Sequence, residues 1–84
     1  MTIERASEVM ESVEYDYEQK NVIVQGLNIM AKYCEDVEIA ADHDEIWAGP
    51  HDSDAIEHMS EEDLRELARL GWSIDDGDSF HHFT

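Results

Sequence analysis

The sequence predicts an α+β fold, in which helices pack on one face of a small antiparallel sheet. Apolar residues recur at helical spacing in three segments of the chain. Two other segments, about residues 37–48 and 72–83, each join short apolar stretches through a polar turn, as β-hairpins do. We expect one domain over residues 1–84, because 84 residues with 42% hydrophobic side chains suffice for a single core.

The N-terminal segment carries a helical apolar stripe. At 100° per residue, one face collects five apolar side chains, namely Ile3, Ala6, Met10, Val13 and Tyr17. Glutamates occupy the adjoining face, so we expect an amphipathic helix within residues 1–18 that is more mobile than the rest. A hairpin over residues 13–24 stays open as an alternative, because Val13–Glu18 alternates strictly and precedes a turn signal. A continuous helix would misalign the next apolar face, so we expect a break near residues 19–21.

Residues 19–34 contain no acidic side chain and form the most apolar part of the chain. Ile23, Leu27, Met30 and Cys34 recur at helical spacing, which predicts a central helix buried on more than one side. Cys34 is the only cysteine, so the chain can form neither an internal disulfide nor a site with several thiolates. We expect a buried, unreactive thiol in a reducing compartment.

The next two elements follow from turn and capping signals. Two short strands flank Asp42-His43-Asp44, a polar loop of three or four residues, and Gly49-Pro50 ends the second strand. A further helix begins after Ser60, whose side chain is suited to an N-cap, and its first turn is acidic. Gly71 is placed to stop this helix in the left-handed conformation.

The C-terminal segment predicts a second hairpin around Asp76-Gly77. A three-residue loop over residues 75–77 places Trp72, Ile74 and Phe80 on one face of the sheet, whereas a two-residue loop separates Phe80 from the other two. The apolar pattern therefore favours the longer loop, with Gly77 at positive φ. His81-His82 is interpreted as part of the strand surface.

The charge is the most unusual property of the chain. Aspartate and glutamate number 22 against five lysines and arginines, which gives a formal net charge of -17. This balance excludes direct binding to nucleic acid or to an anionic membrane, because phosphate would repel the chain. A basic protein surface is the partner that remains. No apolar stretch is long enough to span a bilayer and no basic leader begins the chain, so we expect a cytoplasmic protein.

Motifs for catalysis or metal binding are missing from the sequence. The Asp42 region lacks the central glycine and the final glutamate of a calcium loop, and no histidine pair has the spacing of a zinc motif. The serines lie in cap or turn contexts without a nucleophile elbow, and there is no glycine-rich phosphate loop. We expect a protein that is not an enzyme and has no metal or cofactor.

Carboxylates at regular spacing suggest a different role. Acidic residues three or four apart on a helix, or two apart on a strand, lie at distances close to those between successive phosphates of a nucleic-acid strand. The sequence therefore predicts an acidic face that competes with nucleic acid for a basic channel. The acids expected to contact the partner are Glu35, Asp36, Glu38, Asp42, Asp44, Glu45, Asp52, Asp54, Asp75, Asp76 and Asp78.

Two blocks of the chain carry a resemblance. The segment from Leu64 to Trp72, followed by Asp75, Asp78-Ser79-Phe80 and Phe83, resembles an ending found in small proteins of phages and mobile elements. A second block is similar to the same group, and it comprises Lys32-Tyr33, Glu38, His43-Asp44, Ile46 and Gly49. In size and acidity the chain resembles the anti-CRISPR and anti-restriction inhibitors. That resemblance implies an inhibitor that mimics DNA and binds a CRISPR effector or nuclease complex.

Two other hypotheses stay open at this point. A metal-responsive or structural accessory domain would use His43, His51 and nearby carboxylates, with an acidic surface that serves only solubility. An inhibitor that binds through a surface of tryptophan and phenylalanine would keep its affinity at high salt. The sequence also leaves open a homodimer.

Overall fold

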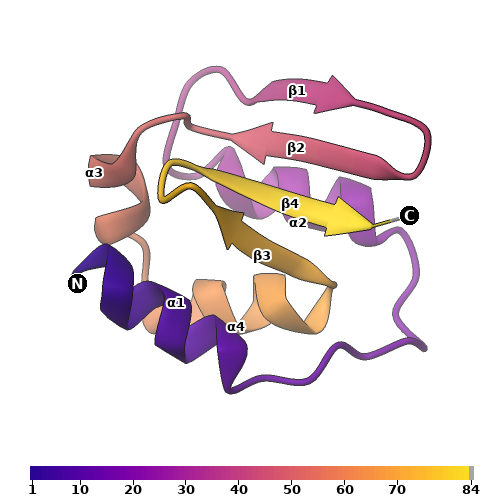
Figure 1. The fold of residues 1–84 in the computed structure, drawn as a ribbon, viewed down its shortest axis with the longest axis horizontal. Helices are drawn as coiled ribbons and strands as arrows, with labels where there is room; N and C mark the ends of the chain where they lie inside the picture. Colours follow the sequence, from indigo (N-terminus) through magenta and orange to yellow (C-terminus); the bar gives the residue numbers. More distant parts are fainter. Residues whose placement is uncertain (84) are drawn as a thin grey trace.

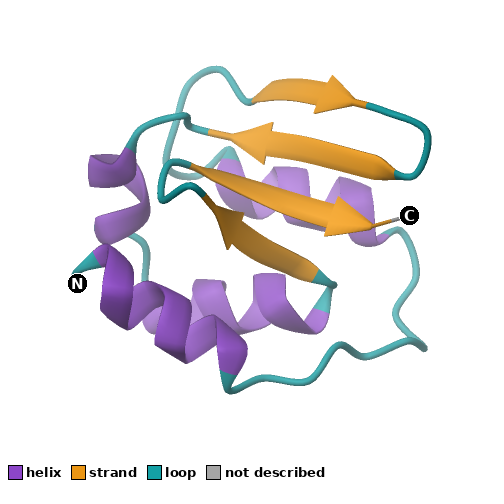
Figure 2. Ribbon diagram, in the orientation of Figure 1, coloured by secondary structure: helices purple, strands orange, loops and turns teal. Residues whose placement is uncertain are grey.

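The computed structural model describes residues 1–83, which form an α+β fold (Figure 1). Helices pack against an antiparallel sheet of four strands, as the sequence predicts (Figure 2). In chain order the elements are α1 (Ile3–Glu11), α2 (Val22–Met30), β1 (Glu38–Ala41), β2 (Glu45–Gly49), α3 (Ser53–Glu57), α4 (Glu61–Arg69), β3 (Trp72–Asp75) and β4 (Ser79–Phe83). None of these helices is long and apolar enough to cross a membrane.

The sheet consists of the two predicted hairpins, which pair side by side in the order β1-β2-β4-β3. The first hairpin turns through residues 42–44, and the backbone N–H of Asp42 donates to the carbonyl of Glu45 at 2.9 Å. Antiparallel pairing of β2 with β4 places Glu45 opposite Phe83 and Ala48 opposite Phe80. The β1–β2 turn and the β3–β4 turn therefore lie at opposite ends of the sheet.

The second hairpin has the predicted loop length, but the loop lies one residue later. Asp75 pairs with Ser79, so residues 76–78 form the loop, and Gly77 has a φ of 78°. Ile74 pairs with Phe80 and Trp72 with His82, which keeps the three apolar residues on one face as expected. Moving a strand by two residues leaves every side chain on its original face, so the apolar pattern could not separate these two registers.

Helix α1 ends earlier than expected, and residues 13–21 form neither of the two predicted structures. Ser12 ends the helix, with its hydroxyl donating to the carbonyl of Val9 at 2.7 Å. The segment then runs extended along the C-terminus of α4, where the N–H of Asp16 donates to the carbonyl of Arg69 at 2.9 Å. Helix and hairpin are both wrong here: the N–H of Asp16 pairs with this distant carbonyl, and the N–H of Gln19 forms a turn by donating to the carbonyl of Asp16 at 3.2 Å.

Helix α2 is present, but its predicted central position is wrong. Only Gly26 and Met30 of this helix are buried, and Val24 is 59% exposed. Asn21 is the N-cap residue of the helix and has a left-handed backbone conformation, with a φ of 55°. It is the last residue of the break predicted near residues 19–21. The helix stops at Met30, so Cys34 lies in the following loop, half-buried instead of buried.

The two later helices differ in how well the sequence predicts them. Helix α4 has the expected signals, since the hydroxyl of Ser60 accepts the N–H of Asp63 and Gly71 ends the helix at a φ of 89°. Helix α3 is not among the elements that the sequence predicts, because five residues are too few for an apolar period to show. The carboxylate of Asp52 caps it by accepting the N–H of Asp54.

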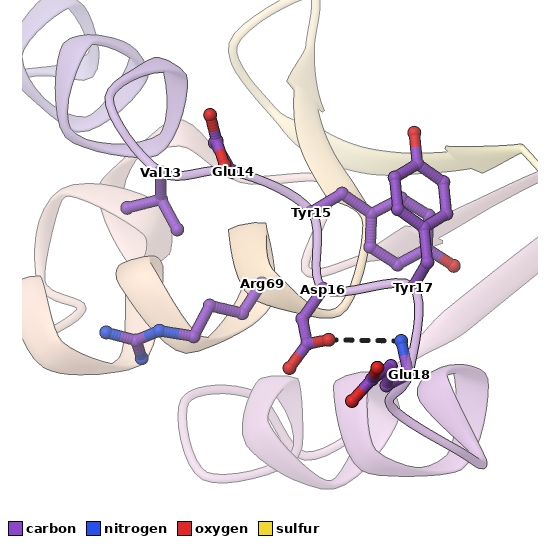
Figure 3. A pocket seen from close by; sticks show the side chains of 7 residues that line it. All are labelled: Val13, Glu14, Tyr15, Asp16, Tyr17, Glu18 and Arg69. Atoms are coloured by element: carbon purple, nitrogen blue, oxygen red, sulfur yellow. Dashed lines mark hydrogen bonds between the residues drawn. The ribbon is translucent and has the colours of Figure 1, made fainter.

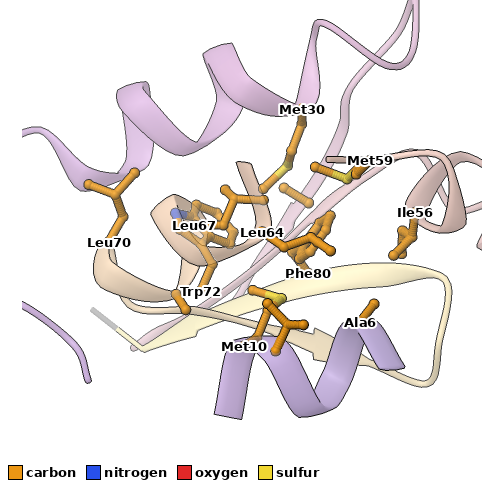
Figure 4. Close-up of a cluster of buried hydrophobic side chains, with 13 residues drawn as sticks. Ala6, Met10, Met30, Ile56, Met59, Leu64, Leu67, Leu70, Trp72 and Phe80 are labelled. Atoms are coloured by element: carbon orange, nitrogen blue, oxygen red, sulfur yellow. The ribbon is translucent and has the colours of Figure 1, made fainter. Parts of the chain in front are cut away.

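The core lies between the helices and the inner face of the sheet (Figure 4). Phe80 is fully buried in its middle, among side chains from α1, α2, α3 and α4. His82 lies on the same face and is 3% exposed, so the expectation that it belongs to the strand surface is wrong. Its Nδ1 lies 3.0 Å from the carbonyl of Gly71, and its ring lies 5.3 Å from that of Trp72.

Candidate protein-binding surface

The cations of the chain are concentrated on its helical side. Within residues 1–83, every ion pair of a lysine or arginine involves an acid of α1 or α4. Four of the 22 acids are neutralised in this way, namely Glu8, Glu61, Asp63 and Glu66. Among the described residues 1–83, no lysine or arginine lies within ion-pair distance of the acids in residues 14–18, 35–54 and 75–78. The formal charge is therefore polarised toward the sheet and its adjoining loops.

The shortest of these pairs joins the end of α2 to the start of α4. The Nζ of Lys32 lies 2.8 Å from the carboxylate of Asp63, which also accepts a hydrogen bond from the hydroxyl of Tyr33. Partial burial acts to raise the pKa of Asp63, but these hydrogen bonds outweigh it and hold the pKa below its usual value. The same contact raises the pKa of Lys32. The members of this cluster are paired with one another, and their contacts link the end of α2 to the start of α4.

The acids predicted as a single partner-binding face are divided between the two ends of the sheet. Asp42, Asp44 and Glu45 lie at the β1–β2 turn. Asp75, Asp76 and Asp78 lie at the β3–β4 turn, which is the opposite end. The acids near that opposite end or in the loops leading to it are Glu35, Asp36, Glu38, Asp52 and Asp54. The structure therefore keeps all these carboxylates at least partly exposed but does not bring them together on one face.

Glu38 and Asp75 illustrate the separation at the far end. They occupy the two edge strands in one row of the sheet, with Gly49 and Ser79 between them. Three strand spacings place them about 14 Å apart. Asp52 is committed to capping α3, and His51 lies 3.7 Å from Glu38. This end presents dispersed carboxylates, not a pocket.

The end of the sheet at the β1–β2 turn combines acids with exposed aromatic rings. Glu45 pairs across the sheet with Phe83, and its Oε1 lies 3.1 Å from Nε2 of His81. The ring of His81 in turn lies 4.5 Å from that of Phe83 and 5.2 Å from that of Trp47, which shares the outer face of the sheet. In Figure 1, α2 lies behind β2 and β4, and no helix covers their near face.

Beside Phe83 lies a hollow of about 460 Å³, which we call the aromatic hollow and define by Tyr15, Tyr17, Gly71 and Phe83. Tyr17 is 84% exposed and Phe83 is 65% exposed, the two highest values among the large hydrophobic side chains. The rings of Tyr15 and Tyr17 lie 4.4 Å apart. Large exposed aromatic rings that gather around a concave site are typical of binding surfaces.

A second hollow of about 590 Å³ adjoins the first and shares both tyrosines. Figure 3 shows the two tyrosine rings on one side of the segment, while the guanidinium of Arg69 extends away from them. That guanidinium pairs with Glu66 at 2.9 Å on α4. The other charged residues of the lining are Glu14, Asp16 and Glu18. The cation that lines this second hollow is thus already neutralised, and the other charged residues of its lining are negative.

Residues 14–18 are not among the acids that the sequence predicts to contact a partner. The spacing of Tyr15 and Tyr17 indicates only a helical stripe or a strand. The available signal was the run of two tyrosines between three acids, since tyrosine among carboxylates combines a flat apolar face with negative charge. That signal becomes specific only when the fold brings Phe83 beside them.

The histidines of the metal hypothesis do not come together. His43 belongs to the β1–β2 turn and is fully exposed, whereas His51 follows the other end of β2. The intervening strand separates them by about 17 Å. Over residues 1–83 no group of three or more histidine, cysteine, aspartate or glutamate side chains is arranged to hold a metal ion.

Comparison of the chain with models of known protein families, with curated proteins and with solved structures finds no match.

Proposed function

We propose that this protein is a binding protein, and not an enzyme, that occupies the basic nucleic-acid-binding surface of another protein. The target class we propose is a nuclease complex such as a CRISPR effector, which the protein would inhibit by excluding DNA. The observation that carries the proposal is the polarised charge: lysines and arginines pair with acids of α1 and α4, and the sheet ends and loops keep their carboxylates unneutralised.

Physical chemistry favours a basic partner over any other. Carboxylates without cationic neighbours create a strongly negative potential, which accelerates association with a basic surface and repels nucleic acid. The energetic cost of burying those carboxylates falls if each meets an arginine or lysine of the partner. Because most of these acids are exposed, the attraction is screened by salt and the affinity falls steeply as ionic strength rises.

Competition with DNA for a CRISPR effector tests the proposal. A labelled target duplex is bound to the purified effector, and its fluorescence anisotropy is followed as the acidic protein is added at several salt concentrations. We expect displacement of the duplex that weakens as salt increases. The absence of displacement from effectors of several types would contradict the effector as target.

Matched charge-reversal variants locate the surface. Asp42→Lys with Asp44→Lys alters the end of the sheet that carries the aromatic rings, while Glu11→Lys with Glu62→Lys alters the helical side. Each pair changes the formal net charge from -17 to -13, and all four residues are exposed. We expect the first pair to weaken displacement at least tenfold more than the second. Equal effects would show that only total charge matters and would contradict a defined surface.

A further inference from the structure

We propose that the aromatic hollow holds the guanidinium group of an arginine side chain from the basic partner. This inference rests on the proposed function and assigns a specific binding site for one side chain of the partner. Tyr15, Tyr17 and Phe83 supply the ring faces, and the charge comes from the acids of the adjoining hollow and from Glu45, which lies opposite Phe83 across the sheet. The occupant is an arginine-bearing segment of another protein.

The first step concerns the rings. Tyr17 and Phe83 expose most of their surface to water, so their rings are free to contact a partner. Tyr15 instead packs against Gly71, and its ring lies 6.1 Å from that of His82, which fixes one wall of the hollow. Tyr17 stacks on this fixed ring at 4.4 Å. The hollow therefore has one rigid wall and two exposed faces.

The second step concerns charge. A cation over an aromatic face is attracted by the negative face of the ring, and arginine also stacks its flat guanidinium on it. Glu14, Asp16 and Glu18 come from the tyrosine segment, and Glu45 lies opposite Phe83 across the sheet. Arg69, the one cation lining the adjoining hollow, is paired with Glu66 and directed away. Charge and ring chemistry thus agree on a cationic occupant.

The third step selects arginine over lysine. A lysine ammonium is compact and strongly hydrated, so it gains from the acids but little from a wide, open hollow with flat walls. A guanidinium is planar and weakly hydrated, so it stacks on a ring while its edge donates to a carboxylate. The carboxylate of Glu45 has one oxygen engaged by His81, which leaves the other to accept such a bond.

Binding of hexa-arginine and hexa-lysine peptides, measured by calorimetry at low salt, tests the inference. The two probes carry equal charge and differ in the cation. We expect the arginine peptide to bind about tenfold more tightly, which corresponds to one or two stacked guanidinium groups. Tyr17→Ala and Phe83→Ala should each reduce that preference to threefold or less. Val24→Ala is the control, because Val24 is also a largely exposed apolar residue but lies on α2.

Each outcome separates the inference from the proposed function. Equal binding of both peptides, or a preference for arginine that persists in both variants, overturns the proposed arginine site. Either result remains compatible with binding through a general acidic surface. Failure of both peptides to bind overturns the arginine site together with the proposed attraction to basic partners. The two variants remove exposed side chains, and the circular-dichroism melting curve of each should match that of the parent. A variant that does not fold is replaced by Tyr17→Ser or Phe83→Ser, so the comparison stands.

Discussion

Gly26→Ala should destabilise the protein, although alanine is the better helix former. Gly26 lies in the interior of α2. The indole of Trp72, the first residue of β3, packs against it. A β-carbon at this position would lie 2.2 Å from Nε1 and 2.7 Å from Cε2 of the indole. Neither atom is the end of a flexible side chain. Trp72 is 2% exposed, and its Nε1–H donates to the carbonyl of Val22 at 3.1 Å.

Three contributions set the size of the effect. Replacing glycine by alanine within a helix stabilises by about 1 kcal/mol. Overpacking a core costs about 1–3 kcal/mol. Displacing the indole also weakens its hydrogen bond, which costs about 1 kcal/mol more. The balance is a loss of about 1–3 kcal/mol, equivalent to a fall in Tm of at least ~4 °C for a domain of this size.

Urea denaturation followed by circular dichroism measures the change as a shift of the midpoint at constant slope. A double-mutant cycle with Trp72→Phe isolates the cause, because phenylalanine removes the atoms that the new methyl group would strike. In that background Gly26→Ala should be neutral or stabilising. A stabilising Gly26→Ala in the parent protein, or a cycle without coupling, would refute the reasoning.

Three other predictions concern single residues. Asp63→Ala should cost about 1–3 kcal/mol at pH 7, because it removes the partner of Lys32 and Tyr33. Since the folded pKa of Asp63 is lowered from 3.8, this contribution is complete above that pH and is lost as pH falls through the folded value. The difference between parent and variant in urea should therefore shrink at pH 2.5, and a constant difference would contradict the pKa argument. Gly71→Ala should destabilise by at least about 2 kcal/mol, measured by thermal melting, because its φ is 89° and a β-carbon would meet Tyr15 and His82 within about 3.0 Å; an unchanged Tm would refute this. Burial raises the pKa of Cys34, with Asp36 adding to the shift, so its reaction with a disulfide reagent at pH 8 should be slower than that of a free cysteine and should accelerate in urea. Equal rates in the folded and unfolded protein would show that the thiol is not protected.

The parts of the fold that the sequence predicted are those with local causes. The two ends of α4 could be predicted from the sequence, because each signal acts within a few residues. These signals are Ser60, the acids that follow it and Gly71. The alternation of Trp72, Ile74 and Phe80 likewise fixed their common face, although it could not fix the register. The path of the chain after α1 depends on a distant partner, because the N–H of Asp16 donates to a carbonyl 53 positions later in the chain. No local periodicity contains that information.

The same distinction explains what was missed in the binding surface. The acids could be recognised one by one, because a carboxylate is charged wherever it lies. Their division between two ends of the sheet depends on the pairing of β2 with β4, which joins segments more than 30 residues apart. Tyr17 and Phe83 likewise gain their role only as neighbours. The aromatic hollow therefore could not be derived from composition or spacing.

In the proposed complex, the net charge and the aromatic hollow would have different effects on binding. Long-range attraction from a charge of -17 accelerates encounter with any basic surface but discriminates poorly among them. Discrimination needs short-range contacts that depend on the shape and chemistry of a side chain, and flat rings beside carboxylates provide such contacts for a guanidinium. Salt should therefore lower the affinity for arginine and lysine peptides alike while leaving their ratio nearly constant, since screening acts on charge and not on stacking. A ratio that collapses with salt would show that charge alone selects the partner.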